Sequence, residues 1–126
     1  MNSVIAVAVG GSLGSVARYF VNQYATMLFG NGFPYGILFV NVVGSAAIGV
    51  AYTFISQAES PSPYRELFIV GVLGGFTTFS TFSLDTINLL ESGAIGRALL
   101  NVVLNLMVCL SACWAALYMT RYWIMR

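Results

Sequence analysis

The scarcity of charged side chains constrains this chain more than any other feature. Only 7% of its 126 residues are charged, whereas 59% are hydrophobic. A water-soluble domain of this size could not cover its surface with so few charges, so the sequence indicates an integral membrane protein. The apolar residues form runs of helix length rather than the ten-residue alternating segments of a transmembrane β-barrel. The composition therefore predicts an all-α membrane fold.

Four apolar runs are long enough to cross a bilayer, because a transmembrane helix needs about 20 residues. They cover approximately residues 3–24, 35–55, 67–90 and 98–119. Gly10 and Gly14 in the first run have the spacing of small residues at close helix–helix contacts. The sequence therefore predicts a single membrane domain over residues 1–126, with four helices and both termini on one side.

The third run contains a stretch that an ordinary membrane helix would not have. Residues 71–83 read Gly-Val-Leu-Gly-Gly-Phe-Thr-Thr-Phe-Ser-Thr-Phe-Ser, with three glycines, five hydroxyl side chains and a phenylalanine at every third position. Glycine is a poor helix former, so the third helix is expected to break near Gly74–Thr78, with Gly74-Gly75 as the place where it loosens. A membrane tolerates the freed backbone groups only where they line a cavity or meet protein or an ion. This stretch is therefore the predicted functional centre.

Polar residues also occur inside the second and fourth spans. Asn101, Asn105 and Cys109 repeat every four residues, so they share one face of the fourth helix. Such a stripe would be costly against lipid, but it fits a helix–helix interface or a conduit. Asn41 in the second span has two equally supported interpretations, a bond between helices and a donor to a permeating ion.

Two charged residues lie within the predicted spans. Arg18 is deep in the first span, where a cation either pairs, faces water or snorkels towards the interface. Asp85 follows the predicted break in the third span, which runs in the same direction as the first. Both side chains should therefore lie towards the same side of the membrane, and we hypothesise that they form an ion pair.

The arginines give the chain almost no preferred orientation in the membrane. Three belong to the side of the termini and two to the other side: Arg65, Arg121 and Arg126 against Arg97 and Arg18. Because an excess of positive charge on the cytoplasmic side sets orientation, this balance predicts insertion in both directions. Two oppositely oriented copies would form an inverted-repeat assembly.

The third-span stretch combines groups that suit an anion with groups that suit a cation. The edges of phenylalanine rings carry partial positive charge, so they can stabilise a small anion without trapping it. Ser80, Thr81 and Asn41 would add donors, whereas carbonyls freed at residues 74–77 would favour a cation. Periodicity alone supports equally a phenylalanine-rich packing face on a kinked helix.

Residues 74–83 resemble the signature of the Fluc (CrcB) family of fluoride channels. The agreement extends to the glycine-rich first span ending in Arg18, to Asn41-Val42-Val43-Gly44 in the second span and to Asn101–Asn105 in the fourth. It covers essentially the whole chain in length, number of spans and order of motifs.

The resemblance implies a dual-topology, antiparallel homodimer with two fluoride pores, one on each side of a central sodium ion. The sodium would be held at the dimer interface by the backbone carbonyls of Gly74 and Thr77 from both subunits. The expected activity is passive, selective efflux of fluoride across the cell inner membrane. The expected partners are fluoride, a second copy of the chain and the lipid bilayer, with no nucleic acid.

The resemblance also implies roles for individual side chains. Arg18 would lie near a vestibule, where it could attract anions. Some relatives have serines on the fourth-helix side of the pore where this chain has Asn105 and Cys109. The side chains assigned to the fluoride pathway come from three spans: Asn41, Phe79, Ser80, Thr81, Phe82, Asn105 and Cys109.

Other function classes fit the sequence less well. A small dual-topology, proton-coupled multidrug transporter also has four short spans, but it needs a membrane-embedded carboxylate, and Asp85 lies near the end of its span. A purely structural subunit would not explain hydroxyls and phenylalanines at one helix break. An enzyme is not expected, because the chain has no His, no Lys and no nucleophile–base pair.

Overall fold

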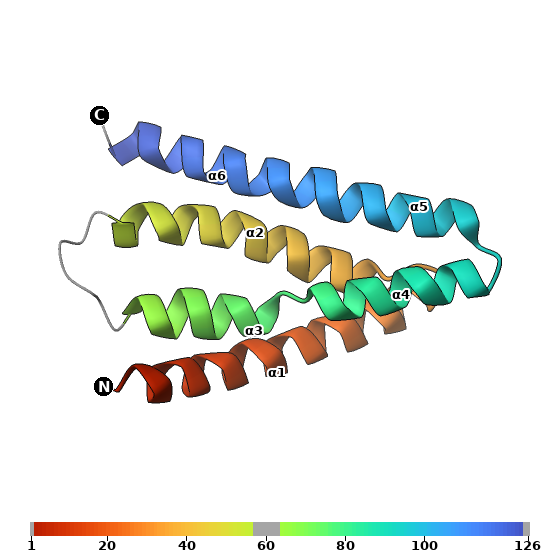
Figure 1. The fold of residues 1–126 in the computed structure, drawn as a ribbon, viewed down its shortest axis with the longest axis horizontal. Helices are drawn as coiled ribbons and strands as arrows, with labels where there is room; N and C mark the ends of the chain where they lie inside the picture. The colour runs from red at the N-terminus through yellow and green to blue at the C-terminus, as the bar shows by residue number, and fades with distance from the viewer. Residues whose placement is uncertain (1, 57–63, 125–126) are drawn as a thin grey trace.

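The protein is an elongated bundle of helices (Figure 1). The computed structural model describes residues 2–56 and 64–124, and every regular element within these ranges is helical. Four helical stretches are long and apolar enough to cross a membrane: Ser3–Phe29, Tyr35–Ile55, Arg65–Glu91 and Ile95–Ile124. The chain is therefore an all-α, multi-pass membrane protein, as its composition predicts. Arg126, which entered the count of arginines, lies outside the described residues.

The first two spans are uninterrupted helices, α1 (Ser3–Phe29) and α2 (Tyr35–Ser56). The side chain of Asn2 caps the start of α1 by accepting a hydrogen bond from the Val4 N–H at 3.1 Å. Helix α1 continues beyond the expected end at residue 24, because no helix breaker occurs before Gly30. Gly30 ends the helix with a φ of +74°, a left-handed conformation that glycine adopts without steric cost.

The third span is broken, as the sequence predicts. It begins with the π-helical segment η1 (Arg65–Leu73), continues as α3 (Gly74–Phe76) and resumes as α4 (Phe79–Glu91). Between α3 and α4, Thr77 and Thr78 are extended, with φ/ψ of −82°/157° and −153°/120°. The break therefore falls within the expected Gly74–Thr78 interval. Gly74 itself is helical, with φ/ψ of −64°/−36°, so the expectation that the glycine pair loosens the helix is wrong.

The glycines of the third span serve close packing against α1. A Cβ atom on Gly75 would lie 2.6 Å from the Gly11 carbonyl oxygen. Cβ atoms on Gly10 and Gly14 would collide with backbone of the third span. The glycine pattern that was predicted to mark a helix contact in the first span therefore does so, with η1 and α3 as its partners.

The fourth span consists of α5 (Ile95–Val103), the π-helical segment η2 (Leu104–Val108) and α6 (Cys109–Ile124). It packs mainly along α2, where Gly49 lies against the Cys113 carbonyl oxygen. The start of α1 and the end of α6 lie at the same end of the bundle, as four spans require (Figure 1).

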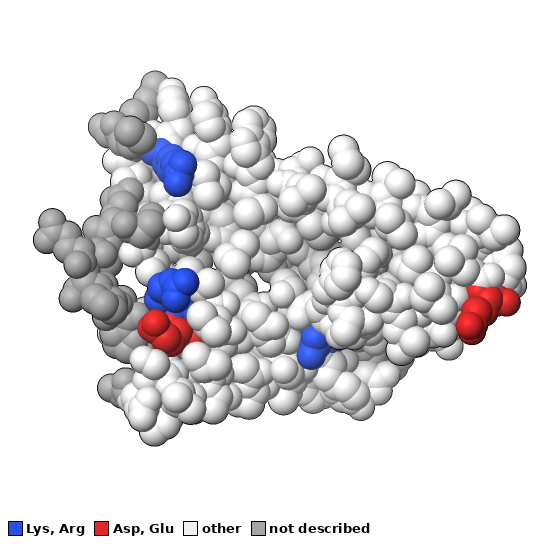
Figure 2. Space-filling model, in the orientation of Figure 1, with Lys and Arg blue, Asp and Glu red and all other residues white. Residues whose placement is uncertain are grey.

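The outer surface of the bundle is suited to an apolar environment. Charged side chains are sparse on the face shown in Figure 2. Large apolar side chains are exposed along all four spans. Buried apolar residues are correspondingly few among the described residues. Contacts between small residues and hydrogen bonds between buried polar residues therefore hold much of the interior of the bundle together.

Candidate functional site

One side chain from α2 satisfies the backbone N–H and carbonyl groups of Thr78, which the helix break leaves without helical partners. The Oδ1 atom of Asn41 accepts a hydrogen bond from the Thr78 N–H at 2.8 Å, and its Nδ2 atom donates to the Thr78 carbonyl oxygen at 3.1 Å. Asn41 thus supplies both bonds that a continuous helix or a neighbouring strand would have given to Thr78. Of the two interpretations of Asn41, the structure shows the bond between helices.

Asn41 also connects the break to the fourth span. Its second N–H donates to the Oδ1 atom of Asn105 at 2.9 Å, so both of its N–H groups have protein acceptors. The Nδ2 atom of Asn105 donates in turn to the carbonyl oxygen and to the Oδ1 atom of Asn101, each at 3.0 Å. Asn101 is fully buried and Asn105 nearly so. The part of the predicted polar stripe formed by these two residues therefore faces the interior of the bundle.

A cluster of hydroxyl groups caps the start of α4. The Thr78 Oγ1 atom accepts a hydrogen bond from the Thr81 N–H at 3.2 Å. The same atom lies within hydrogen-bonding distance of the hydroxyls of Ser80 and Thr81, at 3.2 and 3.1 Å. These hydroxyls gather at the positive end of the α4 dipole, where partial negative charge is favoured.

A cavity of about 310 Å³ opens beside the break. Ser80 and Thr81 are not part of its wall, although both belong to the predicted pathway. Its lining contains seven residues that the sequence analysis assigned to a site: Asn41, Gly74, Thr77, Phe79, Phe82, Asn105 and Cys109. The structure therefore brings residues from three spans together around one space in the middle of the bundle.

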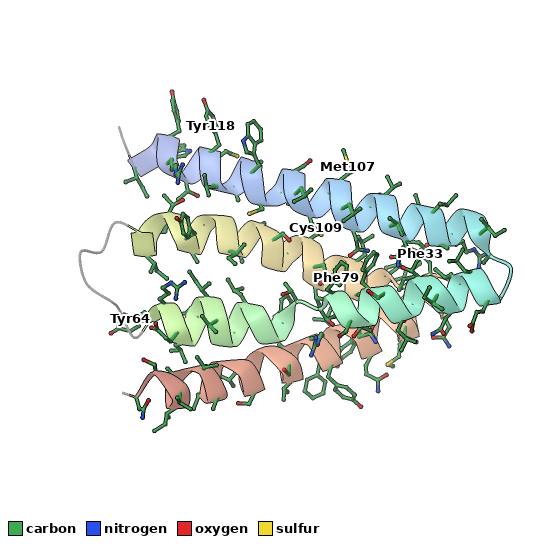
Figure 3. The ribbon with its side chains drawn as sticks, viewed as in Figure 1. Phe33, Tyr64, Phe79, Met107, Cys109 and Tyr118 are labelled. Atoms are coloured by element: carbon green, nitrogen blue, oxygen red, sulfur yellow. The ribbon has the colours of Figure 1, made fainter. Side chains whose placement is uncertain are left out.

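The two phenylalanines of this cavity differ in their surroundings. Their ring centroids are 5.3 Å apart with an interplanar angle of 54°. The side chain of Phe82 is only 6% exposed and is held within the bundle, whereas that of Phe79 is 73% exposed. Phe79 lies where α4 begins (Figure 3), on the outward side of the cavity. One wall of the cavity is thus formed by a ring that is largely exposed.

Arg18 reaches the break from α1. Its guanidinium Nη1 atom donates to the Thr77 carbonyl oxygen at 3.2 Å, and the contact is partly buried. A backbone carbonyl is one of the usual partners of a cation within a membrane span. Arg18 therefore satisfies a carbonyl at the end of α3 that has no helical donor.

The expected ion pair between Arg18 and Asp85 is wrong. Among residues 2–56 and 64–124, the ion pair that forms is Arg65–Glu66, at 3.9 Å. Asp85 instead lines a second cavity of about 340 Å³ near the Gly30–Pro34 turn. It follows Thr77 by eight residues along the third span, whereas the bare Thr77 carbonyl lies within reach of Arg18. The nearer acceptor therefore determines the partner of the arginine.

Thr86 was not identified from the sequence, although it belongs to the same network. Its hydroxyl donates to the Phe82 carbonyl oxygen at 2.8 Å and accepts from the Nδ2 atom of Asn101 at 2.9 Å. A hydroxyl four residues after Phe82 on one helix face was the available signal. Its tertiary partner, Asn101, could not be read from that spacing.

Comparison with known proteins identifies the family of the chain. The family model described as CrcB-like protein, Camphor Resistance (CrcB), matches residues 5–117. This chain belongs to the CrcB-like family. The resemblance seen in the third-span motif is therefore confirmed, and the family consists of ion channels rather than enzymes.

Three similar CrcB-like proteins each carry the name "Fluoride-specific ion channel FluC". The protein of Shewanella woodyi is 46% identical over 110 residues, covering 87% of this chain and 89% of its own length. That of Shewanella piezotolerans is 47% identical over 111 residues, covering 87% and 89%. That of Vibrio parahaemolyticus is 43% identical over 109 residues, covering 86% of each.

Proposed function

We propose that this chain is a fluoride-selective channel that gives passive efflux of fluoride from the cytoplasm across the cell inner membrane. The observation that carries the proposal is the cavity at the helix break, lined by Phe79, Phe82, Asn41 and Asn105. It occurs in a chain that is 43% to 47% identical to proteins named fluoride-specific channels. A passive channel needs no energy source, so the direction of flow follows the electrochemical gradient.

The proposed pathway uses weak, numerous contacts with the ion. The edges of the Phe79 and Phe82 rings carry partial positive charge and replace part of the hydration shell of fluoride. Ser80 and Thr81 hydroxyls and the N-terminal end of α4 continue the favourable field beyond the rings. None of these groups carries a full charge, so the ion can also leave. Cys109 forms part of the cavity wall.

Asn41 contributes to the pathway in a specific way. Both of its N–H groups are bound, to the Thr78 carbonyl and to Asn105 Oδ1. A passing fluoride can therefore receive a hydrogen bond from Asn41 by replacing Asn105 Oδ1 as the acceptor. Fluoride is a small, strong acceptor and can take this place. The exchange involves only the N–H group bound to Asn105, so the bonds between Asn41 and the break stay intact.

The assembly that we propose is an antiparallel homodimer with dual topology and two pores. The outward position of Phe79, 73% exposed at the edge of the cavity, supports a second copy as the other wall of the pathway. The near balance of arginines on the two sides supports insertion in both orientations.

A central sodium ion is proposed at the interface of this dimer. The residues fit such an ion, because Gly74 and Thr77 lie in the last turn and at the C-cap of the helical stretch formed by η1 and α3, where carbonyl oxygens and the helix dipole favour a cation. Hard cations prefer oxygen ligands of this kind. The Thr77 carbonyl already accepts a hydrogen bond from Arg18, and its second lone pair remains for a cation. The sodium would supply a fixed positive charge at the break of each subunit.

Fluoride release from liposomes tests the proposed function. Purified protein is reconstituted into vesicles loaded with fluoride or with chloride, and efflux is followed with ion-selective electrodes. We expect fast fluoride release, chloride release no greater than from protein-free vesicles, and weaker activity in Phe79→Ala and Phe82→Ala. A folded, reconstituted protein that releases no fluoride would refute the proposal.

A further inference from the structure

Five hydrogen bonds form a circuit that leaves the start of α4 at Thr78 and returns to α4 at Thr86, whose hydroxyl bonds back to the first turn of the same helix. The circuit begins at the Thr78 N–H, which donates to Asn41 at 2.8 Å, and Asn41 donates to Asn105 at 2.9 Å. It ends at the carbonyl oxygen of Phe82 in the first turn of α4. We call this set the α4 circuit; its members are Thr78, Asn41, Asn105, Asn101, Thr86 and Phe82.

The second half of the α4 circuit passes through two residues that do not line the cavity, Asn101 and Thr86. Asn105 donates to the Oδ1 atom of Asn101 at 3.0 Å, and Asn101 donates to the hydroxyl of Thr86 at 2.9 Å. The Thr86 hydroxyl then donates to the Phe82 carbonyl oxygen at 2.8 Å. Neither Asn101 nor Thr86 is part of the cavity wall.

All donors of the circuit point in the same direction. Each group donates to the next from the Thr78 N–H to the Phe82 carbonyl, so the bonds polarise one another and strengthen together. Asn101 is 0% exposed, and Asn105 and Phe82 are each 6% exposed, so water cannot replace a lost partner at these positions. Removing one member therefore leaves a buried group unpaired, which is the costly way to lose a hydrogen bond.

The two ends of the circuit bracket the first turn of α4. That turn carries Phe79 and Phe82. The circuit connects it to α2 through Asn41 and, by way of Thr86 farther along α4, to Asn101 of the fourth span. The ring positions are thus fixed by bonds that begin before Phe79 and end at Phe82.

We propose that Thr86 and Asn101 are positioning residues that set fluoride selectivity by holding the first turn of α4. They act through the backbone of Phe82 and through Asn105, without contact with the ion. The proposal rests on the proposed fluoride channel and deepens it, because it assigns selectivity to a buried network as well as to the groups in the cavity.

Thr86→Val tests the proposal, because valine keeps the shape of threonine and removes the hydroxyl. In reconstituted vesicles we expect the ratio of fluoride to chloride release to fall by about tenfold, because the Asn101 amide loses its acceptor and the first turn of α4 is no longer held in place. Thr86→Ser restores the hydroxyl and should restore the ratio. Thr120→Val is the matched control, since its hydroxyl bonds only to the Ala116 carbonyl of its own helix at 2.7 Å; its ratio should equal that of the wild type.

A second measurement does not depend on conduction. Residue-resolved hydrogen exchange follows the Thr78 N–H, which the circuit protects, and the Phe79 and Ser80 N–H groups, which lie at a helix start without helical acceptors. We expect slower exchange at Thr78 than at its two neighbours in the wild type, and faster exchange at Thr78 in Thr86→Val. Equal exchange at the three wild-type positions would overturn the circuit even if Thr86→Val did not fold.

The two measurements separate the proposal from the function on which it rests. A wild-type protein without fluoride release refutes the proposed channel, and the exchange pattern still decides whether the circuit holds α4. A wild-type channel with an unchanged ion ratio in folded Thr86→Val overturns the positioning role. A lower thermal stability in Thr86→Val with an unchanged ratio overturns that role as well, because the bond would then be purely structural.

Discussion

Asn41 acts at the helix break as a substitute for a peptide group. One amide side chain offers an acceptor and two donors, and the Thr78 backbone needs one of each. A hydrocarbon environment makes these bonds obligatory, since no water is present to replace them. The remaining donor binds Asn105. Asn41 also lines the cavity, so one residue both satisfies the backbone at the break and forms part of the cavity wall.

Replacing Asn41 with leucine should therefore affect stability as well as conduction. Asn41→Leu leaves the Thr78 N–H and carbonyl and the Asn105 Oδ1 atom without partners, and we expect unfolding to become easier by about 2–5 kcal/mol. Fluoride release should be lost. Thermal unfolding in detergent and vesicle efflux measure the two effects. Asn88→Leu, at an exposed site on α4, is the control and should change stability by less than about 0.5 kcal/mol.

Arg18 combines a hydrogen bond to the break with a positive charge, and two substitutions separate them. Arg18→Met removes both, whereas Arg18→Gln keeps an N–H donor for the Thr77 carbonyl. We expect Arg18→Met to lower the free energy of unfolding by about 1–3 kcal/mol and Arg18→Gln to recover part of that loss.

The charge of Arg18 has its own readout. If it attracts anions to a vestibule, both variants should fall further below the wild type in fluoride conduction at low ionic strength than at high ionic strength, because salt screens such attraction beyond about 10 Å at 0.1 M. Equal relative conductance at all ionic strengths would assign Arg18 to the break alone.

At the scale of the elements, the sequence predicted the place of the break but not its cause. Glycine propensity pointed to Gly74 and Gly75, which are helical in the structure. The chain opens instead at Thr77 and Thr78, where Asn41 and the Thr78 hydroxyl offer better partners than a continuing helix. Propensity describes a helix in isolation, whereas these partners come from other parts of the fold.

The polar stripe of the fourth span illustrates the same limit. Its spacing predicted that Asn101 and Asn105 share a face, and burial agrees. Spacing along one helix cannot identify a partner on another helix, so the hydrogen bonds to Asn41 and Thr86 could not be predicted from the sequence. The role of Cys109, at the cavity wall, stays a prediction.

The glycines provide a prediction at this scale. A methyl group at position 75 would lie 2.6 Å from the Gly11 carbonyl oxygen, so Gly75→Ala must push α3 away from α1. We expect a loss of about 1–3 kcal/mol in stability, the usual cost of overpacking. Gly96→Ala is the control, because nothing lies within 4 Å of its added methyl group. It should be neutral or stabilising by up to about 1 kcal/mol, as for glycine to alanine in a helix. Thermal unfolding measures both effects. Equal melting temperatures for Gly75→Ala and Gly96→Ala would contradict the packing role of Gly75.

At the scale of the whole molecule, the sequence predicted the membrane class, the four spans and the family. These follow from composition, from the lengths of apolar runs and from a specific motif, all of which are local properties. Figure 2 agrees with them, because the few charged side chains on that face lie mainly towards the two ends, with one positive group midway, and the remaining surface is uncharged. The proposed arrangement of two copies depends instead on surfaces such as the one around Phe79.

The weak charge bias of the chain predicts insertion in both orientations. The side that holds the termini has three arginines and the other has two, whereas a fixed orientation needs a clear excess near the spans. Two reporters fused after residue 126, each active on only one side of the membrane, should therefore both give a signal, each from about half of the molecules.

Adding two lysines after residue 126 should shift most molecules to the orientation with that end in the cytoplasm. Because an antiparallel dimer needs both orientations, fluoride release per molecule should then fall steeply in cells that express only the biased variant. It should recover when a second variant, biased the opposite way by lysines at positions 31 and 94, is expressed with it. Signals from one side alone in the unmodified chain, or undiminished release from the biased variant, would show that the pore does not need opposed copies.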